Sequence, residues 1–219
     1  MSIIDDNLFY GIILVAIIAR MLPVLGKMLC VLYTMIHETA HAIAAILSSS
    51  KILSINLFHD TSGIAKTATS NSFATFIVVI AGYPLAAIFS YLSCYLIYSN
   101  QFQLLLTILL AIAAINLLLW VRNHYGILWL LIFISLISYL IYSQDLKLMK
   151  VFSTFFATIL FVESLVKSFV VFIMSIKSPA LSGDAKILNQ TTHLPSLFWG
   201  IIFLSFSVYM AYLSVILFI

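Results

Sequence analysis

The chain has 219 residues, of which 64% are hydrophobic and 8% are charged, and its formal net charge is +3. Soluble proteins carry about 25% charged residues, so this composition predicts a multi-pass integral membrane protein without a separate soluble domain. We therefore expect one membrane-embedded domain over residues 1–219, surrounded by lipid. The small and scattered positive charge excludes nucleic acid as a partner.

The apolar runs predict an all-α polytopic fold with six to seven transmembrane helices, since a span needs about 20 mainly apolar residues. The expected spans are residues 8–25, 27–47, 73–98, 104–121, 127–142, 151–176 and 196–219. The chain begins with acidic residues, whereas a cleaved signal peptide begins with basic ones, so we expect the first span to be retained. Cys30 and Cys94 lie in apolar runs and are predicted to be buried thiols, neither disulfide-bonded nor metal-binding.

The second span contains the sequence His37-Glu38-Thr39-Ala40-His41. The two histidines are four residues apart, so on a helix they lie one turn apart on one face, where a single Zn²⁺ ion can bind both. Glu38 can then reach a metal-bound water and act as a general base. The alternative is that these polar residues only pack inside a helical bundle. Ionisable groups are costly inside a membrane and usually mark a functional site, which favours one zinc ion per chain.

A polar segment, residues 51–69, follows the second span. Leu53, Ile55 and Leu57 alternate with Ser54, Asn56 and Phe58, which is the period of a strand, and a turn precedes a second short strand. We expect a β-hairpin at the membrane surface. It is either a plain connector or an edge strand whose residues Leu53, Ile55 and Leu57 bind an extended substrate.

The sixth span carries two charged residues, Glu163 and Lys167, spaced four apart with the acid first. This spacing favours a helical ion pair, and we expect the two charges to neutralise each other inside the bundle. A second polar segment, residues 177–195, precedes the last span. Ser182 can cap a short helix that begins near Asp184, which predicts a re-entrant loop with a short helix before the seventh span.

Zinc hydrolases use three protein ligands and leave a fourth position for water, so a third ligand is needed. The downstream candidates are Asp60, Asp145, Glu163, Asp184, His59, His124 and His193. Four spans separate His41 from the second polar segment, so Asp184 returns to the same side of the membrane as His41, whereas Asp145 lies on the opposite side. Such a loop can bring a carboxylate to membrane depth where protein surrounds it. We choose Asp184, with His193 as the second choice.

A membrane-embedded His-Glu-x-x-His with a late aspartate resembles the site-2 protease family of intramembrane zinc metallopeptidases, and in particular a compact branch without an inserted PDZ domain. Weaker similarities occur in the expected order along most of the chain. They are Ala42 and the serine-rich turn after the motif, Ser62-Gly63, Ala81-Gly82-Tyr83, Arg122-Asn123-x-x-Gly126, and Asp184-Ala185 followed by Thr191, Pro195 and Trp199-Gly200.

The resemblance implies that His37, His41 and Asp184 bind zinc and that Glu38 is the catalytic base. One feature departs from the better-studied branches, which place the aspartate in Leu-Asp-Gly or Asn-Pro-Asp-Gly. Here it stands in Gly183-Asp184-Ala185, without the asparagine that assists an oxyanion there. Asn189 or His193 could take that part.

The expected function is therefore an intramembrane zinc metalloendopeptidase that hydrolyses peptide bonds of transmembrane protein substrates, as in regulated intramembrane proteolysis. The alternative is a zinc-binding membrane protein without peptidase activity, such as a binding partner. A transporter would be expected to contain internal repeats, and none is evident. Lysines and arginines are slightly more frequent on the predicted active-site side, which favours a cytoplasmic location for that side.

Overall fold

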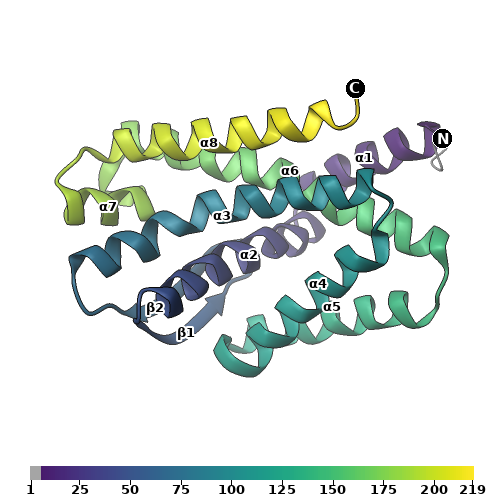
Figure 1. Cartoon of the computed structure of the whole chain (residues 1–219), viewed down its shortest axis with the longest axis horizontal. Coiled ribbons are helices and arrows are strands. Elements are labelled where there is room, and N and C mark those ends of the chain that lie inside the picture. The colour runs from purple at the N-terminus through teal and green to yellow at the C-terminus, as the bar shows by residue number, and fades with distance from the viewer. Residues whose placement is uncertain (1–5) are drawn as a thin grey trace.

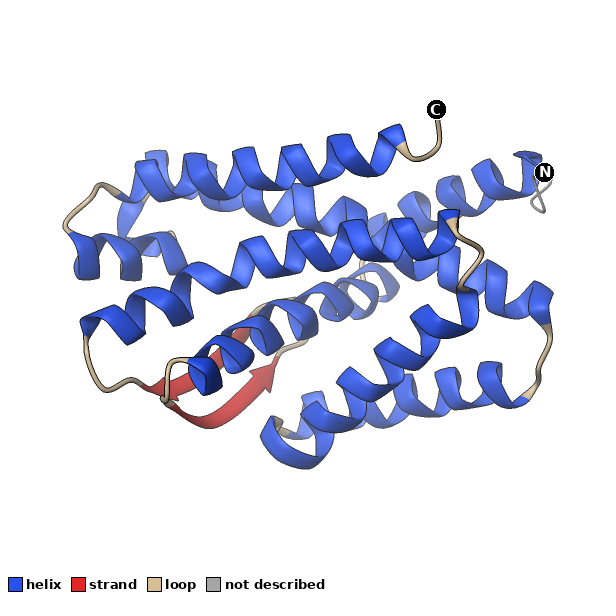
Figure 2. Ribbon diagram, viewed as in Figure 1, coloured by secondary structure: helices blue, strands red, loops and turns tan. Residues whose placement is uncertain are grey.

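The computed structural model of the chain describes residues 6–219 and consists of helices around one small β-hairpin (Figures 1 and 2). The elements in chain order are α1 (Asp6–Met21), α2 (Leu25–Leu47), β1 (Lys51–Leu57), β2 (Gly63–Ala68), α3 (Ser72–Tyr98), α4 (Phe102–Ile115), η1 (Asn116–Trp120), α5 (His124–Tyr142), α6 (Leu146–Lys177), η2 (Pro179–Leu181), α7 (Asp184–Thr192) and α8 (Ser196–Ile216). The predicted all-α polytopic class is confirmed.

Six helical segments in the described part of the chain are long and apolar enough to cross a membrane: α2, α3, α4 with η1, α5, α6 and α8. Between 28% and 39% of the residues in each of these apolar windows are buried, except in α2, where 78% are buried. The outer helices therefore present broad apolar faces to lipid, and α2 lies in the protein interior. The chain is an integral multi-pass membrane protein.

The first predicted span, residues 8–25, is not a separate crossing. Helix α1 has 16 residues, or about 24 Å, against roughly 30 Å of bilayer core. Hydrogen bonds in helical register continue past Pro23, because the Gly26 N–H donates to the Leu22 carbonyl and the Met28 N–H to the Val24 carbonyl. Figure 1 shows α1 and α2 following one another, with both chain termini at the same end. Helix α1 is thus a short apolar helix that leads into α2, the first helix of the described residues that is long enough to span a membrane.

The predicted hairpin is confirmed. Strands β1 and β2 pair antiparallel from Lys51↔Ala68 to Leu57↔Gly63. Its position differs from the expected surface location, because the hairpin folds back along α2. The carbonyl of Thr61, at the turn, accepts a hydrogen bond from the Thr34 hydroxyl (2.8 Å), well inside α2.

The outer edge of β1 is occupied by the segment between α4 and α5. Ile55 bridges Val121 in parallel, and the Arg122 N–H donates to the Ile55 carbonyl (3.2 Å). The Asn123 amide donates to the Leu57 carbonyl (2.5 Å) and accepts from the Leu57 N–H (3.1 Å). These contacts leave the outer edge of β2 as the open edge of the hairpin.

The expected ion pair between Glu163 and Lys167 is wrong. Glu163, which is 1% exposed, accepts a hydrogen bond from the Arg20 guanidinium at the end of α1. The Lys167 ammonium donates instead to the carbonyl (3.0 Å) and hydroxyl (2.7 Å) of Thr61. Each residue of the helical pair finds a closer partner on another element. Cys30 and Cys94 are buried free thiols, as predicted.

Candidate metal centre

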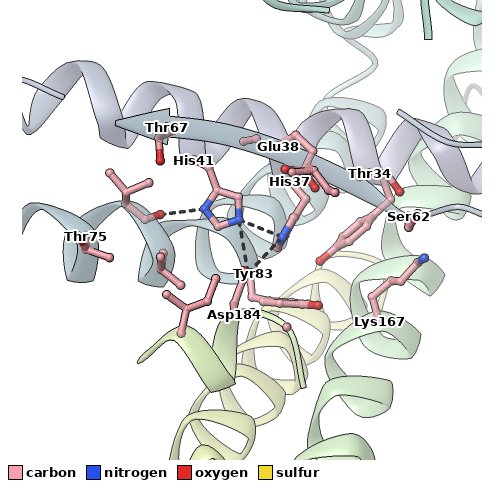
Figure 3. A pocket seen from close by; sticks show the side chains of 18 of the residues that line it. Thr34, His37, Glu38, His41, Ser62, Thr67, Thr75, Tyr83, Lys167 and Asp184 are labelled. Atoms are coloured by element: carbon pink, nitrogen blue, oxygen red, sulfur yellow. Dashed lines mark hydrogen bonds and ion pairs between the residues drawn. The ribbon is translucent and has the colours of Figure 1, made fainter. Parts of the chain in front are cut away.

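Helix α2 presents His37 and His41 on one face, as their spacing predicts (Figure 3). Their Nε2 atoms are 3.1 Å apart, and the ring centroids are 4.6 Å apart with nearly perpendicular planes. His41 is 6% exposed. The helix is long, apolar and central, so it holds both imidazoles deep in the bundle.

Asp184 reaches the same point from the other end of the sequence. It is the first residue of α7, directly after Gly183, whose φ of +57° lies in the left-handed region that glycine adopts at little cost. Ala185 and Leu188 are fully buried and dock α7 against α3, α6 and α8. Asp184 Oδ2 lies 3.2 Å from Nε2 of His37 and 3.3 Å from Nε2 of His41.

The three atoms have the spacing of ligands around one tetrahedral zinc ion. Ligands bound at roughly 2.0–2.1 Å lie about 3.3 Å from each other in that geometry, and the observed separations are 3.1, 3.2 and 3.3 Å. Asp184 Oδ2 is buried and makes no hydrogen bond. Electron pairs on three such close atoms repel one another unless a cation lies between them, so the donor set fits zinc.

The Nδ1 atom of His41 donates to the Val78 carbonyl oxygen on α3 (2.8 Å). This bond holds the proton on Nδ1 and turns the lone pair of Nε2 towards Asp184, as the hydrogen-bond acceptor behind a metal-binding histidine does. His37 is oriented by packing: its ring stacks on Tyr33 at 6.2 Å and meets the edge of Tyr83 at 4.5 Å. Its Nδ1 is buried without a hydrogen-bond partner.

Burial alone would raise the pKa of the Asp184 carboxyl, whereas positive charge on the neighbouring His41 and His37 lowers the pKa below its ordinary value. A metal cation held between the three ligand atoms would favour the ionised carboxylate in the same way.

Glu38 lies beside the histidines with 5% of its surface exposed, and it lines a cavity of about 500 Å³. The same cavity is lined by His37, His41 and Asp184, by β2, and by Lys167 (Figure 3). A carboxylate and three potential ligands thus share one space that is large enough for a peptide segment.

Two glycines make room for this arrangement, and the sequence analysis noted them only as weak family features. A Cβ atom on Gly82 would lie 2.5–2.6 Å from ring atoms of His37 and His41. A Cβ atom on Gly63 would lie 2.5 Å from Glu38 Oε1 and from Thr34 Cγ2. A glycine inside an otherwise apolar helix, such as Gly82, is the signal that indicates close approach of another group.

The other candidate ligands lie elsewhere. Asp60 is exposed and accepts from the Ser62 N–H and hydroxyl, hydrogen bonds that lower the pKa of its carboxyl. Asp145 caps the start of α6 by accepting from the Lys147 and Leu148 N–H groups, at the opposite end of the bundle. His59, His124 and His193 are outside the cavity.

Neither residue suggested as an oxyanion partner lines the cavity. The Asn189 amide donates to the Leu194 carbonyl (2.8 Å) after α7, and His193 is exposed in a left-handed conformation at the same turn.

The three predicted substrate-binding residues also lie outside the cavity. Leu53 is exposed, whereas Ile55 and Leu57 are fully buried in the main apolar core, where β1 packs against α2, η1 and α5. Residues of β2 and its flanking turn, including Gly63, Ala65 and Thr67, line the cavity in their place. The strand next to the candidate metal centre is therefore β2.

Among known families, the model described as Peptidase M50B-like matches residues 10–214 of this chain. The match spans both histidines, the glutamate, the hairpin and Asp184. No curated protein and no solved structure matches the chain.

Proposed function

The chain belongs to the Peptidase M50B-like family, a family of membrane metallopeptidases of the site-2 protease type, and on this premise we propose that it is an intramembrane zinc metalloendopeptidase. Its substrates are transmembrane proteins, and it holds one Zn²⁺ through His37, His41 and Asp184. The observation that carries the proposal is the convergence of these three ligand atoms within 3.3 Å, in a cavity that also contains Glu38.

Zinc bound there would lower the pKa of a water molecule towards neutrality and polarise the scissile carbonyl. Glu38 is the residue that moves protons: its carboxylate accepts one from the attacking water and donates it to the leaving amine. The contact with Gly63 keeps the carboxylate beside β2. The Val78 carbonyl and Tyr83 ring hold His41 and His37 in place while this occurs.

The substrate is proposed to bind as a strand along the open edge of β2. A helical segment hides its carbonyls in intrahelical hydrogen bonds, so a transmembrane substrate must unwind before cleavage. Because β1 pairs with only one edge of β2, the other edge offers N–H and C=O groups to an extended chain. This assignment moves the predicted edge from Leu53, Ile55 and Leu57 to residues 63–68.

The active-site end is proposed to face the cytoplasm. Lys51, Lys66, Arg122, Lys177 and Lys186 are counted on that side, against Lys147 and Lys150 on the other, with Arg20 and Lys27 near it. The positive-inside rule favours the end with more lysine and arginine.

The test compares wild type with Glu38→Gln in proteoliposomes that contain single-span peptides, with products identified by mass spectrometry. The variant keeps the shape of the side chain and all three ligands. We expect it to retain zinc and to lose at least about 10²- to 10⁴-fold in cleavage rate, which is the usual contribution of a general base.

Cleavage that survives Glu38→Gln would contradict the mechanism. Zinc-loaded wild type that cleaves no peptide in the pool would instead support the alternative of a zinc-binding protein without peptidase activity.

A further inference from the structure

A second cavity, of about 470 Å³, lies at the break between α1 and α2 and is closed on its other side by α6. It adjoins the cavity of the candidate metal centre, because Thr61 and Lys167 line both. The two spaces are therefore neighbours along α6, with Lys167 at the boundary between them.

The charge of the second cavity is positive. Arg20, Lys27 and Lys167 line it, and Glu163 is its one acidic lining residue. Arg20 and Glu163 neutralise each other as an ion pair. Lys27 is exposed at the start of α2. The remaining cation is Lys167, which lies at the boundary with the metal-centre cavity and has no acidic side chain among the described residues that balances its charge.

Lys167 has a donor to spare. An ammonium group carries three N–H donors, and its partners here are the carbonyl and the hydroxyl of Thr61, both neutral. No carboxylate forms an ion pair with it in the part of the chain whose side chains the structure describes. A lysine inside a membrane-spanning helix is costly and marks a candidate functional site, and an ammonium with a free donor can bind a group of opposite charge.

The backbone at Thr61 supports a fixed position for this ammonium. Thr61 has a φ of +71°, a strained conformation for a β-branched residue. Its carbonyl accepts hydrogen bonds from both Thr34 and Lys167, which hold the turn in place. The ammonium is thus tied to the turn that leads directly into β2.

Thr61 stands two residues before Gly63, the residue that lies against Glu38. The Thr61 carbonyl that binds Lys167 also accepts from the hydroxyl of Thr34, which stands four residues, or about 6 Å, before Glu38 on α2. In an extended peptide, side chains two residues apart point to the same face and are about 7 Å apart. A peptide that lies extended along β2 with its scissile bond at Glu38 therefore brings the side chain two residues away within reach of Lys167.

We propose that Lys167 is a specificity residue that binds the carboxylate of an Asp or Glu side chain located two residues from the scissile bond of the peptide substrate. This inference rests on the proposed peptidase function and adds a preference for acidic substrates.

The test uses pairs of single-span peptides that differ only by Glu or Gln at the position two residues from the mapped cleavage site, on either side. For wild type we expect kcat/KM to favour the Glu peptide about 10- to 100-fold, as one charge-assisted hydrogen bond would. Lys167→Met should abolish this preference, and Lys167→Glu should transfer it to a matched Lys peptide. Lys177→Met removes an exposed lysine of the same helix and should leave the preference intact.

Equal cleavage of both peptides by wild type would overturn the inference and leave the peptidase proposal standing. If wild type cleaves neither, the peptidase proposal fails, and the binding of the same fluorescent peptides to wild type decides the inference: tighter binding of the Glu peptide, lost in Lys167→Met, would support it. Equal binding of the two peptides would contradict the inference. It would also be contradicted if anionic phospholipid vesicles competed for the site and removed the difference in binding between the peptides.

Discussion

A buried ion pair at the α1–α6 contact and the buried cluster of the candidate metal centre differ in how their polar atoms are satisfied. At the α1–α6 contact, the carboxylate of Glu163 is paired with the Arg20 guanidinium. In the metal centre, Asp184 Oδ2 and His37 Nδ1 are buried without hydrogen-bond partners. A cluster that only stabilises a fold pairs its charges internally, whereas one that binds a ligand keeps atoms free for it. The comparison favours a structural role for the first cluster and supports the proposed ligand site at the second.

The largest expected effect on stability comes from Arg20→Ala. It leaves Glu163, which is 1% exposed, as a buried carboxylate without its partner, and removing one member of a buried pair costs about 3–5 kcal/mol. Thermal unfolding in detergent measures the loss. Protein kept folded at low temperature should still bind zinc, because the ligands lie on other elements.

The control replaces both Arg20 and Glu163 by Met, which removes both charges and should recover most of the lost stability. Loss of zinc from folded Arg20→Ala would show that the two clusters are not separate, and the comparison would break.

Gly82→Ala is expected to have a smaller effect, and to change zinc affinity instead of stability. The added methyl group would displace the His37 and His41 rings, so zinc affinity should fall about 10- to 100-fold, as when the support of a ligand is lost. The melting temperature of the zinc-free protein should change little, since alanine favours a helix more than glycine does.

Gly11→Ala is the matched control for this substitution, because nothing lies within 4 Å of the added atom. Competition with a fluorescent zinc chelator measures the affinity of both variants. Unchanged zinc affinity in Gly82→Ala would contradict the geometry of the metal centre.

The convergence of His37, His41 and Asp184 at the candidate metal centre was predictable because two simple rules act on it. Helical periodicity places His37 and His41 together, and counting the crossings between His41 and Asp184 returns the aspartate to the same end of the bundle. The wrong prediction of a separate span at residues 8–25 did not affect this result. That segment precedes both ligands, so it does not enter the count of crossings between them.

Other features depend on contacts that sequence spacing does not reveal. The spacing of Glu163 and Lys167 predicts a local ion pair, but it carries no information about Arg20, 143 residues away, or about the turn at Thr61. The alternation of apolar residues identified β1 as a strand. It did not reveal that residues 121–123 occupy the outer edge of β1, so that β2 is the strand beside the cavity. The need for glycine at position 82 arises only once α3 packs against α2.

The most direct test of the central claim is the zinc content of the purified protein, measured by elemental analysis for wild type, His41→Ala and Asp184→Ala. The account predicts about one zinc per chain in wild type and a loss of zinc in both variants, because three protein ligands hold the ion. Zinc that is lost with His41→Ala but retained with Asp184→Ala would contradict the three-ligand centre. Absence of zinc from wild type, even after zinc is added back, would contradict the metal centre altogether.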